Sequence, residues 1–156
     1  MPSKSPPIKH FLTDLAIRAV HRELRPVYQV TTAETIGPKG RGLIWDFQPR
    51  DGFDNLSQAV IIRLLTPQGE LTPLGHADFG SRVYELIGQG NTDTTRNLLK
   101  LFILDALQRE PRIEKVVECK VQTSPGTKST VDVYLRVKPV QAQEIVVIGP
   151  FSIELN

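Results

Sequence analysis

Apolar residues recur at helical spacing near the start of the chain. Between residues 8 and 24 they form one stripe among mostly polar or charged positions: Ile8, Phe11, Leu12, Leu15 and Ala19. Steps of three and four residues predict an amphipathic helix, which Arg25-Pro26 would end. A second helix is expected from Leu56 to Leu65, with Asp54 or Asn55 as its cap. A short third helix, capped by Ser81, is expected before Gly88.

The longest helical pattern lies between Thr92 and Glu110. Thr92 or Asp93 is expected to cap its exposed amides. The apolar residues fall on nearly every side of the helix: Leu98, Leu99, Leu101, Phe102, Ile103, Leu104 and Ala106. A helix of this kind is normally buried in the middle of a domain. Pro111 would end it, because proline also disfavours helical geometry at the preceding residue.

After Arg112 the hydrophobic period becomes that of a strand. The stretch from Ile113 to Val121 is expected to be a strand, with Val117, Cys119 and Val121 on one face, and residues 123–129 form a turn by composition. The clearest alternation follows, at Val131, Val133, Leu135 and Val137. A last apolar run over residues 145–155 predicts one more strand or a broken pair. Two further short strands are expected over residues 27–32 and 43–48.

This order of elements favours an α+β fold, with about three to four helices packed on a C-terminal antiparallel β-hairpin or sheet. The 156 residues suit one domain that buries a sizeable core. We expect an N-terminal extension over residues 1–41 and a main domain over residues 42–156.

Composition excludes several classes of protein. The net charge of +2 gives no bias toward nucleic acid. Cys119 is the sole cysteine, so the chain has no internal disulfide and no multi-cysteine zinc site. No apolar run reaches the roughly 20 residues that span a bilayer, and the first residues contain no secretory signal. The prediction is a cytoplasmic protein without membrane contact of its own.

Few residues suggest catalysis or ligand binding. The three histidines have no spacing typical of a metal site, so we expect no metal and no cofactor. The glycine-rich segment of residues 37–42 carries Lys39 and Arg41 but lacks the ending of a P-loop. Three carboxylates near one ordered loop, Glu70, Asp78 and Glu85, are the candidates for a glycosidase pair. Nothing around them indicates the raised pKa that a general acid needs.

The corner at Glu110, Pro111 and Arg112 breaks a local rule. Glu110 places a negative charge at the negative end of the helix dipole, where Lys or Arg is favoured. Arg112 follows directly after a stiff proline. Such a violation is often functional, although a surface Glu–Arg pair that closes a helix is the alternative interpretation.

Together with two other segments, this corner resembles the baseplate wedge and sheath-initiator family of contractile tails. The first segment is the helix that ends in Thr66-Pro67-Gln68-Gly69-Glu70, and the second is Phe79-Gly80-Ser81 followed by a short apolar helix. The third is Glu110-Pro111-Arg112 at the end of the long helix. The family occurs in contractile phage tails, type VI secretion baseplates and other contractile injection systems. The loop between residues 70 and 80 is longer than usual for the family.

The resemblance implies a structural protein and not an enzyme. Glu110, Pro111 and Arg112 would contact the helical core bundle of larger baseplate wedge subunits. The strand with Val131, Val133, Leu135 and Val137 would belong to a sheet that receives extended arms of the sheath subunit, and tube or hub proteins would lie nearby. Two rival functions are a lysozyme-like peptidoglycan hydrolase that uses Glu70 and Asp78, and a small adaptor that binds acidic partners through Lys39 and Arg41.

Overall fold

The computed structural model describes residues 14–22, 25–30, 32–36, 43–47, 49–50 and 52–156. The chain divides into two compact units between Ala59 and Val60, inside helix α1 (Gly52–Leu65).

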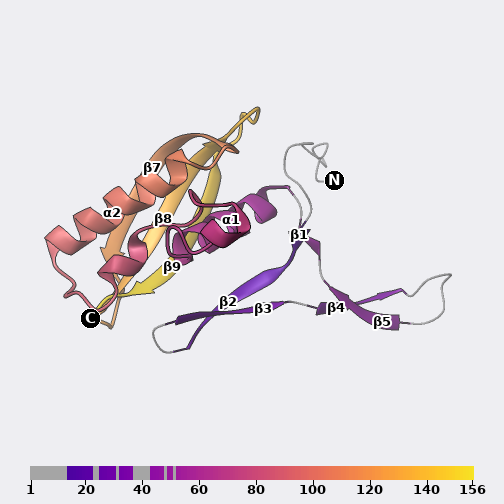
Figure 1. The fold of residues 1–156 in the computed structure, drawn as a ribbon, viewed down its shortest axis with the longest axis horizontal. Coiled ribbons are helices and arrows are strands. Elements are labelled where there is room, and N and C mark those ends of the chain that lie inside the picture. The colour runs from indigo at the N-terminus through magenta and orange to yellow at the C-terminus, as the bar shows by residue number, and fades with distance from the viewer. Residues whose placement is uncertain (1–13, 23–24, 31, 37–42, 48, 51) are drawn as a thin grey trace. The chain divides into compact units, whose positions relative to one another are not determined.

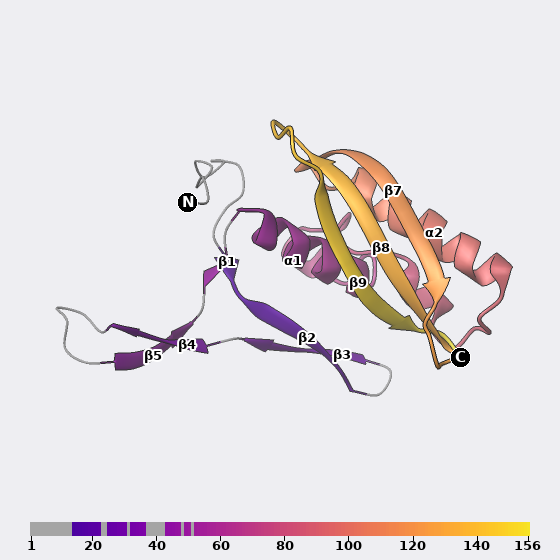
Figure 2. The ribbon, with the colours of Figure 1, turned by 180° about the vertical axis from the view of Figure 1, so that it is seen from behind.

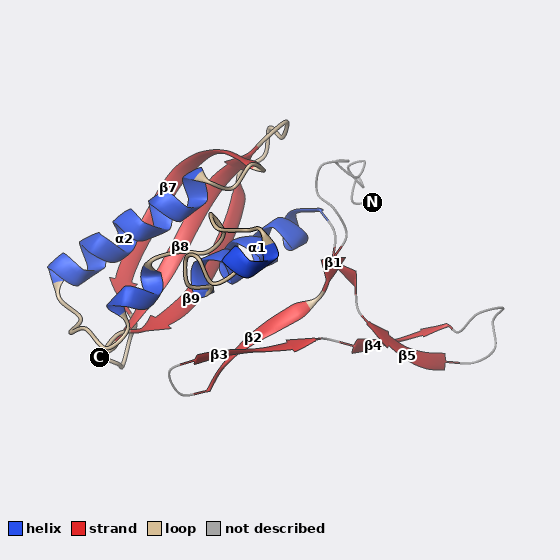
Figure 3. Ribbon diagram, viewed as in Figure 1, coloured by secondary structure: helices blue, strands red, loops and turns tan. Residues whose placement is uncertain are grey.

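The first unit consists of short strands and the first half of α1. The strands form three two-stranded sheets, β1 with β6, β2 with β3 and β4 with β5; Figure 3 shows them in red. Their bounds are β1 (Asp14–Leu15), β2 (Ile17–Arg22), β3 (Arg25–Val30), β4 (Thr32–Ile36), β5 (Leu43–Phe47) and β6 (Pro49–Arg50). The short strands expected over residues 27–32 and 43–48 are therefore present, apart from the residues outside the described part.

The helix expected over residues 8–24 is wrong wherever the chain is described. Residues 14–15 and 17–22 are strands, and the other end of the prediction lies outside the described residues. A short apolar stretch fits both the helical and the strand period, and the segment that follows it in the chain determines which structure forms. Here β3 pairs antiparallel with all of β2, from Ile17 opposite Val30 to Arg22 opposite Arg25. The β-branched and aromatic residues of the two segments, such as Val20, Val27 and Tyr28, favour that pairing.

One side chain of α1 anchors the first strands. The amide of Gln58 accepts a hydrogen bond from the Ile17 backbone N–H at 2.8 Å and donates one to the Leu15 carbonyl at 2.7 Å. Between them lies Ala16, which is fully buried. Gln58 therefore holds the backbone on both sides of Ala16, where β1 ends and β2 begins.

The second unit places helices on one face of a three-stranded antiparallel sheet. The sheet has the order β7 (Ile113–Thr123), β8 (Thr130–Pro139) and β9 (Val146–Glu154). Helix α2 (Asp93–Gln108) and the last residues of α1, 60–65, cover the same face, in front of the sheet in Figure 1 and behind it in Figure 2. Two short 3₁₀ helices, η2 (Thr72–Leu74) and η3 (Val83–Leu86), lie in the connection.

The predicted fold class is therefore wrong in its numbers of helices and of strands. The described residues contain two α-helices and a sheet of three strands, in place of three to four helices on a hairpin. Two of the expected helices account for the difference, because residues 14–15 and 17–22 are strands and the segment after Ser81 is a single 3₁₀ turn. The last apolar run is one strand, β9, and not a broken pair.

Helix α2 is buried on one side only. Thr92 caps it, as expected, by accepting a hydrogen bond from the Thr95 backbone N–H at 3.1 Å. Leu99 and Ile103 are fully buried, whereas Leu98 and Leu101 are 38% and 58% exposed. The expectation of an all-round buried helix is wrong, because only one layer of structure packs against α2 in its unit.

The core of the second unit lies between these helices and the sheet. Every second residue of β8 points into it, and the side chains that fill it are almost fully buried: Val60, Leu64, Val83, Leu86, Leu99, Ile103, Leu107, Val131, Val133, Leu135, Val137, Ile148 and Ile153. The opposite face of the sheet carries Tyr134 and exposed ion pairs such as Lys138 with Glu114. This is the usual division of an antiparallel sheet. A register shift between Val116 and Glu118 turns Val117 outward, contrary to the predicted face.

Candidate functional site

The three segments that carry the family resemblance meet at the end of α1. The connection that follows the helix folds back to its end, where Pro67 and Ser81 form an isolated parallel β-bridge. The Gln68 backbone N–H donates a hydrogen bond to the Ser81 carbonyl at 2.9 Å. The Gly69 N–H donates to the carbonyl of Phe79 at 3.4 Å. The first and second segments are therefore paired along their backbones.

Ser81 and Gly80 hold this return in place. Ser81 donates from Oγ to the Leu64 carbonyl at 2.6 Å, and its backbone N–H donates to the Thr66 carbonyl at 2.8 Å. Both bonds satisfy carbonyls that the helix end leaves without partners. Gly80 has a φ of +100°, and a Cβ there would lie 2.7 Å from the backbone oxygens of Thr66 and Pro67. Only glycine fits at this position.

Arg63 links this return to the Glu110 corner. It comes from the last turn of α1, and its guanidinium lies over the ring of Phe79, 4.5 Å from the centroid. Its Nε donates to Oε2 of Glu110 at 3.2 Å, and the Nη2 atom lies equally close to that oxygen. The Arg63 side chain is only 9% exposed, so the guanidinium is held between a ring and a carboxylate.

Glu110 is the centre of the cluster. Its side chain is 2% exposed, and it receives Arg63 on Oε2 and Arg112 on Oε1. The Nε atom of Arg112 donates at 2.6 Å, and the Arg112 backbone N–H contributes a longer bond at 3.4 Å. A buried carboxylate with two arginines satisfies its charge inside the chain.

The electrostatics of Glu110 follow from these contacts. Burial raises the pKa of this carboxyl, but the hydrogen bond from Arg112 and the positive charges of Arg112 and Arg63 outweigh burial. The pKa of Glu110 therefore lies below its ordinary value of 4.5. The carboxylate is ionised at neutral pH and fixes both guanidinium groups.

The predicted contact residues of the corner differ in what they can offer to a partner. Glu110 points inward, whereas Pro111 is exposed and the Arg112 side chain is 25% exposed. Arg112 uses Nε for Glu110, and among the described residues no partner takes its two terminal nitrogens. A hollow of about 210 Å³ opens beside Arg63, bordered by residues 75–79 and Arg109. The outward chemistry of the corner is thus a proline and an oriented guanidinium.

The four predicted sheet residues lie in the core. Val131, Val133, Leu135 and Val137 are fully buried, and their strand, β8, is paired on both sides by β7 and β9. An incoming strand therefore cannot pair with β8. An extended arm of the sheath subunit could pair only with the outer edge of β7 or of β9, and strand addition stays a prediction.

Sequence reasoning missed Arg63, although the signal was present. Arg63 is the one charged residue between Leu56 and Leu65, in the middle of an aliphatic run. A cation placed there must either interrupt the buried side of the helix or meet an acid. The acid is Glu110, 47 residues away in the sequence, which no local pattern indicates.

The residues of the rival functions are on the surface or outside the described part. Glu70 and Asp78 are exposed, and Glu85 pairs with Arg82. Residues 37–42, with Lys39 and Arg41, lie outside the described residues. Cys119 faces the core as expected, and burial raises the pKa of its thiol to about 11. His21 belongs to a strand, so it shares no helix face with His10, which is not described.

The described residues contain no group of three or more His, Cys, Asp or Glu side chains arranged to hold a metal ion. None of the helices described has the length and apolar character needed to cross a membrane.

No protein-family model matches the chain, and no curated protein matches it in sequence.

Proposed function

We propose that the chain is a non-enzymatic structural component of a contractile tail or contractile injection system. In this proposal it docks on larger baseplate wedge subunits and forms the template for the first ring of sheath subunits. One observation carries the proposal. The segments ending in Glu70, Ser81 and Arg112 are far apart in the sequence, yet they converge on the end of α1 around Arg63.

The convergence explains why the three segments would occur together. Phe79 stacks on Arg63, Gly80 permits the close return, and Ser81 closes the helix end. Glu110 then joins Arg63 to Arg112. Each segment supplies one part of a single rigid corner, which supports a role in assembly.

The corner has the chemistry of a docking surface. Glu110 positions Arg112 through Nε, and no partner among the described residues takes the two terminal nitrogens of the guanidinium, whose side chain is 25% exposed. The planar fork of a guanidinium binds a carboxylate through two parallel hydrogen bonds. Glu110 is therefore a positioning residue, and Arg112 with Pro111 makes the contact.

The sheet supports the second part of the proposal. A three-stranded antiparallel sheet has two outer edges, here on β7 and β9. Such edges accept an extended segment of another protein, mainly through backbone hydrogen bonds. Main-chain pairing depends little on side-chain identity, which suits a subunit that must begin a ring of different subunits.

The test is the composition of the assembly that contains this chain. The chain is tagged at its native locus and purified from its source, and the copurified proteins are identified by mass spectrometry and electron microscopy. We expect contractile particles with wedge, tube and sheath subunits, and no assembled sheath when the gene is deleted. Normal sheaths in the deletion strain would refute the proposal.

A further inference from the structure

The two outer edges of the sheet are not equivalent. The pairing of β9 with β8 is interrupted between Val133 and Leu135, where Gly149 and Pro150 bulge out, and proline has no backbone N–H to donate. In contrast, β7 pairs with β8 without interruption from Glu118 to Thr123. Among the described strands no other pairs with β7, so this stretch is the regular open edge.

A groove runs between this edge and helix α2. It encloses about 380 Å³, and its walls are residues 119–122 of β7 and four residues of α2: Asp93, Arg96, Asn97 and Lys100. The α2 residues are spaced by three and four, so they form one flank of the helix. The β7 residues are consecutive, so the groove is lined by the backbone edge as well as by side chains.

The α2 wall of the groove carries a net positive charge. Arg96 and Lys100 contribute two positive charges to it, against one negative charge from Asp93, which pairs with Arg96. Lys120 lies opposite Tyr134 on the other face of the sheet and pairs with Glu118 at 2.9 Å, so it adds no charge to this wall. Lys100 is exposed and forms no ion pair with any described residue. An extended segment that carries carboxylates on the side facing α2 would complement these charges.

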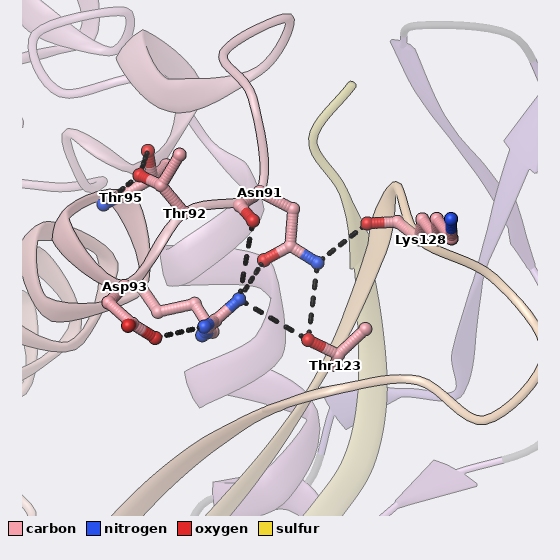
Figure 4. Close-up of polar contacts among 7 residues, drawn as sticks. Asn91, Thr92, Asp93, Thr95, Thr123 and Lys128 are labelled. Atoms are coloured by element: carbon pink, nitrogen blue, oxygen red, sulfur yellow. Dashed lines mark hydrogen bonds and ion pairs between the residues drawn. The ribbon is translucent and has the colours of Figure 1, made fainter.

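One end of the groove is fixed by a polar cluster between the helix and the strand. The Asn91 side chain donates to the Lys128 carbonyl at 2.7 Å and to Thr123 Oγ1 at 3.3 Å, and it points toward both in Figure 4. Arg96 donates to Asn91 Oδ1 at 2.6 Å and also reaches Thr123 Oγ1. The cluster ties the start of α2 to the end of β7. The groove is thereby formed before any partner arrives, which lowers the cost of binding.

We propose that the groove between α2 and the edge of β7 binds an extended acidic segment of a partner protein as a fourth strand. Backbone hydrogen bonds to residues 118–123 would set its register, and its acidic side chains would face Lys100 and Arg96. This inference deepens the proposed function and rests on it for the source of the segment, an arm of a neighbouring subunit.

The inference can be tested with the full chain and synthetic peptides. The chain is labelled with ¹⁵N and titrated with an eight-residue peptide of alternating glutamate and valine, while amide shifts and hydrogen exchange are followed. Two control peptides carry lysine in place of glutamate, or N-methyl groups on every second residue. We expect the glutamate peptide to shift and protect amides of residues 118–123, and both control peptides to bind at least about tenfold more weakly.

Matched variants locate the charge contribution. Lys100→Glu should weaken binding of the glutamate peptide about tenfold, because attraction becomes repulsion in the groove. Lys138→Glu makes the same charge change at an exposed position of β8, outside the groove, and should leave binding unchanged. The spectrum of each variant reports whether it folds.

Several results would overturn the inference: equal binding of the glutamate and lysine peptides, equal binding of the N-methylated peptide, or shifts confined to β9 or to the exposed face. These results are independent of the particle experiment. If the chain is found in contractile particles but binds no glutamate peptide, the inference about the groove is refuted and the proposed function stands. If the chain binds the peptide at β7 but copurifies with no contractile particle, the proposed function is refuted and peptide binding in the groove stands.

Discussion

Replacement of Glu110 by glutamine tests the buried brace of the corner. The amide keeps the size of the carboxylate but leaves the guanidinium of Arg63, 9% exposed, without a counter-charge. Removal of one partner from a buried ion pair costs roughly 3 to 5 kcal/mol. Glutamine still offers one oxygen as an acceptor, and Arg112 is partly exposed, so we expect the lower end of that range. For a chain of this length, 3 kcal/mol lowers Tm by roughly 6 to 12 °C.

A double-mutant cycle separates the brace from general damage. Arg63→Met removes the buried cation, and the variant with both Arg63→Met and Glu110→Gln no longer contains an unpaired buried charge. We expect the double variant to be more stable than the sum of the single effects predicts. Lys138→Met, which breaks an exposed pair with Glu114, serves as the control and should leave Tm within about 2 °C.

The stability lost in the Glu110→Gln variant should depend on pH. The pKa of Glu110 is lowered in the folded chain, so its ionised form stabilises the fold above the ordinary value of 4.5 and loses this effect as pH falls through the lowered value. The Tm difference between the wild type and Glu110→Gln should be full at pH 7 and shrink below about pH 4.5. Thermal and urea unfolding followed by circular dichroism measure both quantities. Equal stability of the two proteins at pH 7 would refute the brace.

Other predictions concern the helix return, the thiol and the rival activity. Gly80→Ala should destabilise the chain more than Gly88→Ala in thermal unfolding, because both glycines have positive φ but only at Gly80 would a Cβ meet backbone oxygens. Ser81→Ala should cost about 1 to 3 kcal/mol in urea unfolding, since the Leu64 carbonyl loses a buried hydrogen bond. Cys119 should react with a thiol reagent at pH 8 about 100-fold more slowly in the folded than in the unfolded chain, because its pKa is about 11 against an ordinary 9.0. On a peptidoglycan zymogram the wild-type chain should give no clearing; clearing that Glu70→Gln removes would support the hydrolase.

Elements that one local pattern determines were predictable. The alternation of β8 is strict, and every predicted inward residue from Val131 to Val137 is buried. The start of α2 at Thr92 and its end before Pro111 follow from capping and from proline geometry. These signals are confined to a few neighbouring residues, so the sequence alone determines them.

Elements that depend on a distant partner were not predictable. The stretch from Ile17 to Arg22 fits a helix by spacing, and its strand pairing becomes evident only with β3 beside it. Leu101 counted as buried because it is apolar, yet its exposure depends on how many layers pack around α2. The role of Glu110 depends on Arg63, from another helix. Sequence reasoning therefore found the corner but gave Glu110 an outward role, whereas its carboxylate is enclosed.

The direct test of docking through the corner is incorporation of Arg112 variants into particles. Arg112→Lys retains a positive charge beside Glu110 but removes the planar fork, so the chain should stay folded. The ratio of tagged chain to sheath protein in purified contractile particles, measured by quantitative mass spectrometry, is compared with that of Lys138→Arg. The proposal predicts at least a tenfold lower ratio for Arg112→Lys and an unchanged ratio for Lys138→Arg. Wild-type incorporation of a folded Arg112→Lys chain would contradict docking through this corner.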